Sequence, residues 1–251
     1  MATRSSIEWT EMTWNPVTGC SKVSQGCKNC YANRMALRLK AMGTSRYKNG
    51  FTPTIHEDLV DLPKKWRKPR TIFVNSMSDL FHEAIPEAFI RRIFATMADC
   101  PQHTFQVLTK RSKRLRELGP TLKWPTNVWM GVSVEGAEVM SRIDDLANVP
   151  AHVRFLSCEP LIAPLENLPL DGIHWVIVGG ESGPGARHMQ AEWVESIQMQ
   201  CATAGVLFFF KQWGGVRKHR TGRTLNGRVF DEMPELAGAS MAPSNFVQIA
   251  I

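Results

Sequence analysis

The sequence lacks an apolar run approaching the roughly 20 residues that a membrane-spanning helix needs. Its first residues, MATRSSIEWTEMTW, contain one arginine but no apolar segment typical of a secretory signal. We therefore expect a cytoplasmic protein with no membrane partner. Thiols stay reduced in that compartment, so the six cysteines are expected to serve as ligands or catalytic groups rather than in disulfides.

Several nucleotide-binding and metal motifs are also absent. The chain contains no P-loop G-x-x-x-x-G-K-[ST] and no H-E-x-x-H, and GGESGPG (179–185) does not match G-x-G-x-x-G. Low-complexity segments are absent as well, and 43% of the residues are hydrophobic. A length of 251 residues suits one large domain or two small ones.

The charge is unbalanced, with a formal net charge of +7 and a pI near 9.3. This excess favours an anionic partner, although dispersed surface charge is an equally good explanation. Two basic stretches, LPKKWRKPR (62–70) and RKHRTGR (217–223), are expected to flank the same face of the protein, at the mouth described below, and favour a nucleic-acid substrate; solvated loops are the alternative. Their candidate contacts are Lys64, Lys65, Arg67, Lys68, Arg70, Arg217, Lys218 and Arg220.

Short apolar runs alternate with helix-like segments. The runs are 71–75, 104–108, 128–134, 153–157, 174–180 and 206–210, with a possible seventh strand around 9–15. They are nearly continuous in Val, Ile, Phe and Leu, as in parallel strands buried on both faces. Their spacing of 22 to 32 residues is typical of βαβ units. The pattern predicts an α/β fold, an incomplete parallel (β/α) barrel of six to seven strands that is TIM-barrel-like.

Helices are expected between these strands. Pro86 would open the helix in 86–99, Ser112 would cap the one in 110–118, and 137–148 and 191–204 supply two more. We expect one domain, with the barrel over 1–213 and a C-terminal appendage over 214–251 that packs on it.

Polar residues follow every predicted strand, where ligands bind in parallel α/β folds. They predict a functional mouth. Its members are Asn75, Ser76, Ser78, Asp79, Lys110, Arg111, Ser133, Glu135, Cys158, Glu159, Gly179, Gly180, Glu181, Lys211 and Gln212. The glycine pair before Glu181 would bring backbone N–H groups and a carboxylate to a bound ammonium or ribose, or would simply form a tight turn.

Three cysteines lie within eleven positions, as C-x6-C-x2-C at Cys20, Cys27 and Cys30. A structural zinc site needs four ligands, so His56 or Cys100 would have to complete one here. Three buried, metal-free cysteines are a second interpretation. The third is a [4Fe–4S] cluster in which three thiolates leave one iron open to a small molecule such as S-adenosyl-L-methionine.

Six segments and a C-terminal stretch resemble a known family, the phage-borne three-cysteine-motif proteins, catalogued largely as a domain of unknown function. They are WNPVTGCSKVSQGCKNCYA, IFVNSMSDLFHEAIP, FQVLTKR, FLSCEPL, VIVGGESGPGARHM and FFFKQWGG, followed by GRTLNGRVFDEMP, and they span about residues 6–234. That family is itself similar to radical S-adenosylmethionine enzymes. The resemblance implies a bacterial or phage-infected host cell, an electron donor and a three-cysteine-motif partner protein.

The same resemblance implies roles for individual residues. Cys20, Cys27 and Cys30 would bind the cluster. Asn75, Ser76, Ser78 and Asp79 would contact S-adenosylmethionine. Ser133, Gly179, Gly180 and Glu181 are further cofactor-binding candidates, from their position at the strand ends. The cysteine spacing departs from the superfamily's commonest C-x3-C-x2-C, and the aromatic residue follows the last cysteine instead of preceding it.

The catalytic candidates are Cys158, Glu159 and Lys211. Cys158 would relay a hydrogen atom, with a small buried hydrophobe as the alternative role. Lys211 would meet an anionic group or pair with Glu159 or Glu181. The function expected is radical S-adenosylmethionine-like modification or repair of nucleic acid or a nucleotide, such as DNA modification. The alternatives are a metal-stapled nucleic-acid-binding protein without catalysis, and a conventional barrel hydrolase using Glu159 and Glu181.

Overall fold

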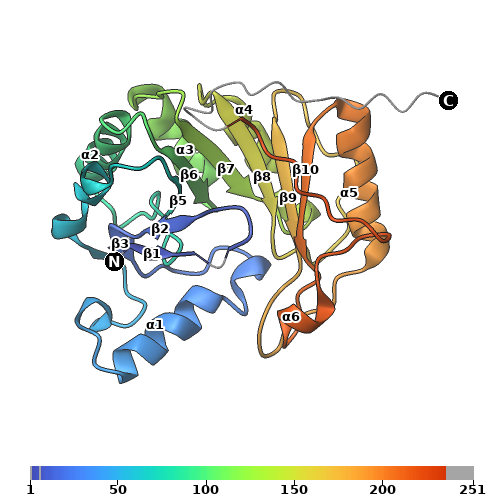
Figure 1. Ribbon diagram of the computed structural model, residues 1–251, viewed down its shortest axis with the longest axis horizontal. Coiled ribbons are helices and arrows are strands. Elements are labelled where there is room, and N and C mark those ends of the chain that lie inside the picture. Colours follow the sequence, from blue (N-terminus) through green and yellow to red (C-terminus); the bar gives the residue numbers. More distant parts are fainter. Residues whose placement is uncertain (1, 6, 236–251) are drawn as a thin grey trace.

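The computed structural model describes residues 2–5 and 7–235. Its main sheet has eight strands in the order β1-β2-β5-β6-β7-β8-β9-β10, with β1 and β10 as the edge strands (Figure 1). The strands are β1 (Ala2–Arg4), β2 (Met12–Trp14), β5 (Thr71–Val74), β6 (Thr104–Thr109), β7 (Val128–Ser133), β8 (Val153–Cys158), β9 (Trp175–Gly179) and β10 (Leu207–Gln212). Strands β3 (Val17–Thr18) and β4 (Thr54–Ile55) pair separately.

Seven of these strands run parallel, from β2 to β10, and only β1 is antiparallel to its neighbour. The incomplete parallel barrel is therefore confirmed, with β2 as the seventh strand expected near residues 9–15. All strands of the parallel set end at the same edge of the sheet. Residues that follow them are thereby brought together across long sequence separations.

The helices are α1 (Tyr31–Ala41), α2 (Glu87–Ala98), α3 (Ser112–Leu118), α4 (Ser141–Ala147), α5 (Ala191–Ala204) and α6 (Lys218–Thr221). Pro86 precedes α2 directly, as expected. Ser112 is the first residue of α3 and does not cap it, because its hydroxyl donates to Asp145 Oδ2 at 2.7 Å. No helix in the described part of the chain is long and apolar enough to cross a membrane.

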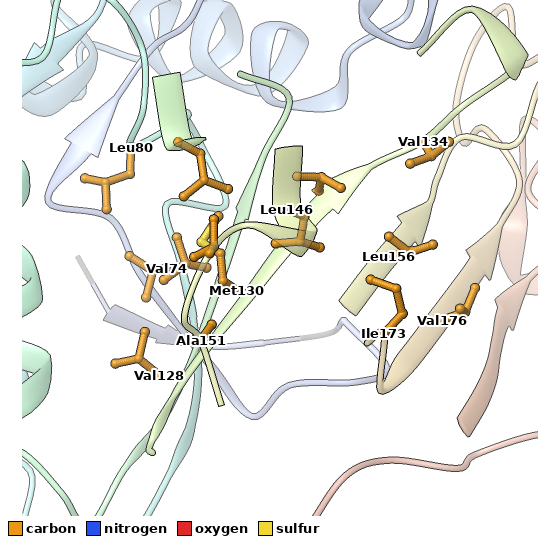
Figure 2. Packing of buried hydrophobic residues seen from close by; sticks show 14 of the residues in the cluster. Val74, Leu80, Val128, Met130, Val134, Leu146, Ala151, Leu156, Ile173 and Val176 are labelled. Carbon is orange, nitrogen blue, oxygen red and sulfur yellow. The ribbon is translucent and has the colours of Figure 1, made fainter. Parts of the chain in front are cut away.

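The alternation of side chains along each strand divides the core into two layers. Leu156 of β8 and Val176 of β9 belong to the larger layer, which includes apolar residues of α2 and α5 and is shown in part in Figure 2. Phe155 of β8 and Trp175 of β9 belong to a second, aromatic cluster. Each strand residue therefore points either toward the helices or toward the aromatic cluster, and the next residue in the strand points toward the other one.

The segment after β10 runs along the sheet edge. Phe210 N–H donates to Phe230 O at 3.0 Å, and Phe208 N–H donates to a carboxylate oxygen of Glu232 at 2.8 Å. These bonds pair backbone groups of the edge strand that would otherwise lie open. The predicted appendage therefore contacts β10 as far as it is described, and its residues 236–251 lie outside the described part.

Candidate functional site

A cavity of about 430 Å³ opens at the carboxyl ends of the parallel strands. Its walls come from the segments that follow β2, β5, β6, β7, β8, β9 and β10. Polar or charged lining residues include Asn75, Ser76, Ser78, Asp79, Lys110, Arg111, Ser133, Ser157, Glu159, Glu181 and Lys211. Most of the polar residues predicted for the mouth therefore line a single cavity.

All three clustered cysteines line this cavity as free thiols. Among the residues that the structure describes, no histidine and no fourth cysteine line it with them. Within residues 2–5 and 7–235, no three His, Cys, Asp or Glu side chains are arranged to hold a single metal ion. The expected zinc ligands lie elsewhere: His56 hydrogen-bonds Thr18 Oγ1 at 2.9 Å, and Cys100 is buried in the core. Neither residue therefore completes a four-ligand site with the three thiols.

The start of the cysteine loop is held by Arg111, at the end of β6. Its guanidinium donates to Cys20 Sγ at 3.4 Å and to Ser21 Oγ at 2.9 Å. Asp79 orients Arg111 by accepting from Nη1 at 3.2 Å. His82, which is buried, adds a 2.9 Å hydrogen bond between its Nε2 and the same Ser21 hydroxyl. Burial raises the pKa of Cys20 to about 11, an effect that Asp79 adds to and Arg111 opposes.

The middle of the loop lies on Glu135, a fully buried carboxylate just after β7. Ser24 Oγ donates to Glu135 Oε1 at 3.1 Å, and Lys110 pairs with the same oxygen. Arg142 pairs with the other oxygen at 2.9 Å. Gly26 allows this approach, because a Cβ there would lie 2.4 Å from Glu135 Cγ.

The end of the loop is held by Glu181, which follows β9. Asn29 Nδ2 donates to Glu181 Oε2 at 2.9 Å, and Arg187 pairs with Oε1 at 2.6 Å. Arg187 also donates to Gln25 O at 3.1 Å. Burial raises the pKa of Glu181, but the hydrogen bonds from Arg187 and Asn29 outweigh it and lower the pKa to about 2. Glu181 is therefore an ionised anchor for the loop at neutral pH.

The four residues expected to bind S-adenosylmethionine after β5 all line the cavity, but three have internal partners. Ser76 Oγ donates to Asn15 Oδ1 at 3.2 Å, and Ser78 Oγ donates to Val17 O at 2.8 Å. Asp79 accepts from Thr109 Oγ1 at 2.7 Å as well as from Arg111. They build the wall and leave few donors for a ligand.

Asn75 is the exception. Its Oδ1 accepts from Val17 N–H at 3.3 Å, which fixes the amide orientation, while its buried Nδ2 has no hydrogen-bond partner. The residue also has a φ of 60°, in the left-handed region that asparagine tolerates better than most residues. An unpaired buried donor costs about 1–3 kcal/mol, so Asn75 is the wall residue best suited to a ligand acceptor.

Further round the wall, Lys211 Nζ lies 2.5 Å from Glu159 Oε1. Gly179 lies beside this pair, since a Cβ there would meet Glu159 and Lys211 at 3.4 Å. Gly180 and Ser133 line the cavity, whereas Gly179 does not. A Cβ at Gly180 would lie 2.0 Å from Trp213 O, so this glycine permits close packing of the ends of β9 and β10.

Cys158 does not reach the cavity, which corrects its expected catalytic position. Its side chain is fully buried in the core layer that contains the helices, and burial followed by the proximity of Cys201 raises its pKa. Ser157 and Glu159 line the cavity on either side of it. The alternation of a strand explains this: the residue between two cavity-facing neighbours points the other way.

Aromatic residues that the sequence did not single out contribute to the cavity. Trp9 and Phe73 line it, with ring centroids 4.7 Å apart and an angle of 60° between the planes. Trp9 Nε1 is buried and has no hydrogen-bond partner. Trp9 lies just before β2, a strand of three residues. The sequence around it indicated only a possible strand at 9–15 and not a cavity residue.

The two basic stretches lie at opposite ends of the sheet, which corrects the expectation that both flank the mouth. Residues 62–70 precede β5, and Trp66 packs against His103 just before β6. They therefore lie where the parallel strands begin. The stretch 217–223 follows β10 and stays at the mouth, with Arg217 and Arg220 exposed.

Comparisons with known proteins give a family and distant structural likenesses. Spore photoproduct lyase complexed with dinucleoside spore photoproduct matches with a TM-score of 0.47 and 9% identity, over 80% of this chain and 63% of the lyase chain. A mutant of that lyase with bound AdoMet and dinucleoside spore photoproduct matches with a TM-score of 0.44 and 9% identity, over 76% and 61%. This chain thus spans less than two thirds of these structures.

No curated protein matches the chain. A sequence-family profile described as "Protein of unknown function (DUF5131)" matches residues 4–234, which is nearly the whole chain. The protein therefore belongs to the DUF5131 family.

Proposed function

We propose that this protein is an iron–sulfur enzyme of the radical S-adenosylmethionine type, with Cys20, Cys27 and Cys30 as the ligands of a [4Fe–4S] cluster. One observation carries the proposal. Three thiols, without a histidine or a fourth cysteine, line a cavity at the carboxyl ends of seven parallel strands. Four thiolates normally complete a cluster, so three leave one iron for a ligand.

The residues around the thiols fit such a group. A four-iron cluster binds each thiolate through a different iron, so the sulfurs need not converge on one point as they must around zinc. Arg111 brings a cation to Cys20 Sγ, which opposes the rise in the pKa of this thiol that burial causes. Bonds from the ends of β6, β7 and β9 fix the cysteine loop at Ser21, Ser24 and Asn29.

The chemistry supplied by such a cluster with S-adenosylmethionine is one-electron cleavage of a sulfonium to give a carbon-centred radical. The chain's own part is to bind and orient. Asn75 Nδ2 would donate a hydrogen bond to the carboxylate of the bound cofactor. The Lys211–Glu159 pair lies on the wall and offers both charges to a polar substrate.

Metal analysis of anaerobically prepared protein tests the proposal. We expect about four irons and four sulfides per chain, and loss of most of them in Cys20→Ala, Cys27→Ala and Cys30→Ala. Cys201→Ala is the matched control, because Cys201 is buried in α5 away from the cavity. It should keep its iron.

Other results would contradict the proposal. One tightly held zinc per chain, with no iron under anaerobic conditions, would indicate a metal-stapled binding protein. Iron that survives all three cavity substitutions would show that the thiols are not its ligands.

A further inference from the structure

The positive charge of this protein is concentrated in one segment around the cavity. Residues 12–56 contain seven Lys and Arg and no Asp or Glu. The remaining 23 Lys and Arg are matched by the chain's 23 Asp and Glu. The formal net charge of +7 therefore equals the charge of this segment alone. We call it the basic segment.

Five of its seven cations are exposed, and no carboxylate in the described part of the chain pairs with them. These five are Lys22, Lys28, Arg38, Lys40 and Lys48. The other two have partners: Arg34 donates to Ser182 O at 2.8 Å, and Arg46 pairs with Asp58 at 2.5 Å. The exposed cations are thus available to an anionic partner.

The exposed charges continue from the cysteine loop along α1. Lys22 and Lys28 lie in the cysteine loop, and Arg38 and Lys40 in the last turn of α1. At 1.5 Å per residue, α1 extends the row by about 16 Å. Figure 1 shows α1 and α6 at the same end of the molecule, α1 below the β1 edge of the sheet and α6 below the β10 edge. Exposed Arg217 and Arg220 therefore add charge across the mouth from the basic segment.

We propose that the basic segment docks a single nucleic-acid strand, with its phosphates along Lys28, Arg38, Lys40 and Lys48 and one nucleotide entering the cavity. This docking proposal rests on the proposed function, because it takes the cavity as the site of the reaction. A row of cations holds a polyanion independently of its sequence. Trp9 and Phe73 line the cavity and supply aromatic surface for a base.

The chain offers a matched pair of variants. The first, Arg38→Gln with Lys40→Gln and Lys48→Gln, removes three charges from the basic segment. The second, Lys65→Gln with Arg67→Gln and Lys68→Gln, removes three exposed charges at the opposite end of the sheet. None of the six contacts the cysteine loop, so iron content should match the parent protein in both.

The test is fluorescence anisotropy with a labelled single-stranded DNA oligonucleotide, and with an RNA of the same sequence, over a range of salt concentrations. We expect the first variant to bind about 10-fold more weakly, with a slope of log K against log salt that is shallower by about 2. The second variant should bind like the parent protein.

Equal weakening in both variants, or in neither, would overturn the proposal. Absence of binding to either oligonucleotide would also overturn it, and would leave an acidic protein as the partner for a surface that also exposes Met35 and Leu37. Iron analysis of the same samples separates the two proposals. Iron-free protein that still binds DNA through the basic segment would contradict the cluster and not the docking surface.

Discussion

Asn29 and Glu181 are 152 residues apart in the sequence, and their side chains form a 2.9 Å hydrogen bond. The bond joins the cysteine loop after β2 to the end of β9, across the mouth of the sheet. Glu181 also binds Arg187, which reaches Gln25 of the same loop. The position of the three thiols thus depends on strand ends on the far side of the cavity.

This anchor predicts a pH dependence of stability. The pKa of Glu181 falls from 4.5 to about 2 on folding, so its contribution is fully present above about pH 4.5 and is lost as pH falls towards 2. At about 1.4 kcal/mol per pKa unit, it amounts to on the order of 3 kcal/mol. Glu181→Gln should therefore unfold more easily than the parent protein at pH 6 and 7.

Chemical denaturation of the metal-free protein at several pH values measures this difference. The gap between parent and Glu181→Gln should narrow steadily from pH 4.5 downward. A gap that stays constant down to pH 3 would show that ionised Glu181 is not the anchor.

Gly26 predicts a steric effect on iron binding. Alanine there places a Cβ 2.4 Å from Glu135 Cγ, a distance that real contacts do not allow. Because Glu135 is fully buried and held by Lys110 and Arg142, the cysteine loop must move instead. We expect Gly26→Ala to lose most of its iron.

The control for this change is Gly119→Ala, where the new Cβ would lie at an ordinary 3.5 Å from Val149. It should keep its iron. If Gly26→Ala binds iron as well as the control does, the loop position fixed by Glu135 is not needed for the ligands.

Substitution of Asn75 should lower the affinity for S-adenosylmethionine and leave the iron content unchanged. Asn75→Asp keeps an acceptor for Val17 N–H and removes the unpaired donor. Loss of one buried hydrogen bond costs on the order of 1.4 kcal/mol, so S-adenosylmethionine should bind about 10-fold more weakly. Equilibrium dialysis with labelled cofactor measures this. Unchanged affinity at unchanged iron content would remove Asn75 from the binding site.

Substitution of Cys158 should change the stability of the protein and not its activity. Its thiol is buried among apolar residues beside the helices, so Cys158→Ala should lower the free energy of unfolding by about 1 kcal/mol. Cleavage of S-adenosylmethionine by the reduced protein should proceed at the parent rate. A large loss of cleavage in a folded variant would show that the Cys158 thiol affects the cavity despite its burial.

The fold could be predicted from the sequence because each parallel strand is a short continuous apolar run. The runs at 71–75 and 174–180 correspond to β5 and β9 with shifts of one residue at their ends. The edge strand β1 was missed, since Ala2–Arg4 carries no apolar signal. Eleven of the fifteen residues predicted for the mouth line the cavity, as expected from the rule that ligands bind at carboxyl ends.

Two features of the sheet explain why the expected positions of Cys158 and of residues 62–70 were wrong. Strand alternation separates Cys158 from its cavity-facing neighbours Ser157 and Glu159. The direction of β5 places residues 62–70 at the far end of the sheet. By contrast, the bonds that hold the loop, such as Asn29 to Glu181, depend on distances between strands that no local pattern contains.

Electron paramagnetic resonance of the reduced, iron-loaded protein, recorded with and without S-adenosylmethionine, tests the central claim most directly. Three protein ligands leave one iron to bind the cofactor, so its addition should change the spectrum of the reduced cluster. The Cys201→Ala variant should respond in the same way. An iron–sulfur spectrum that is identical with and without S-adenosylmethionine would contradict the account.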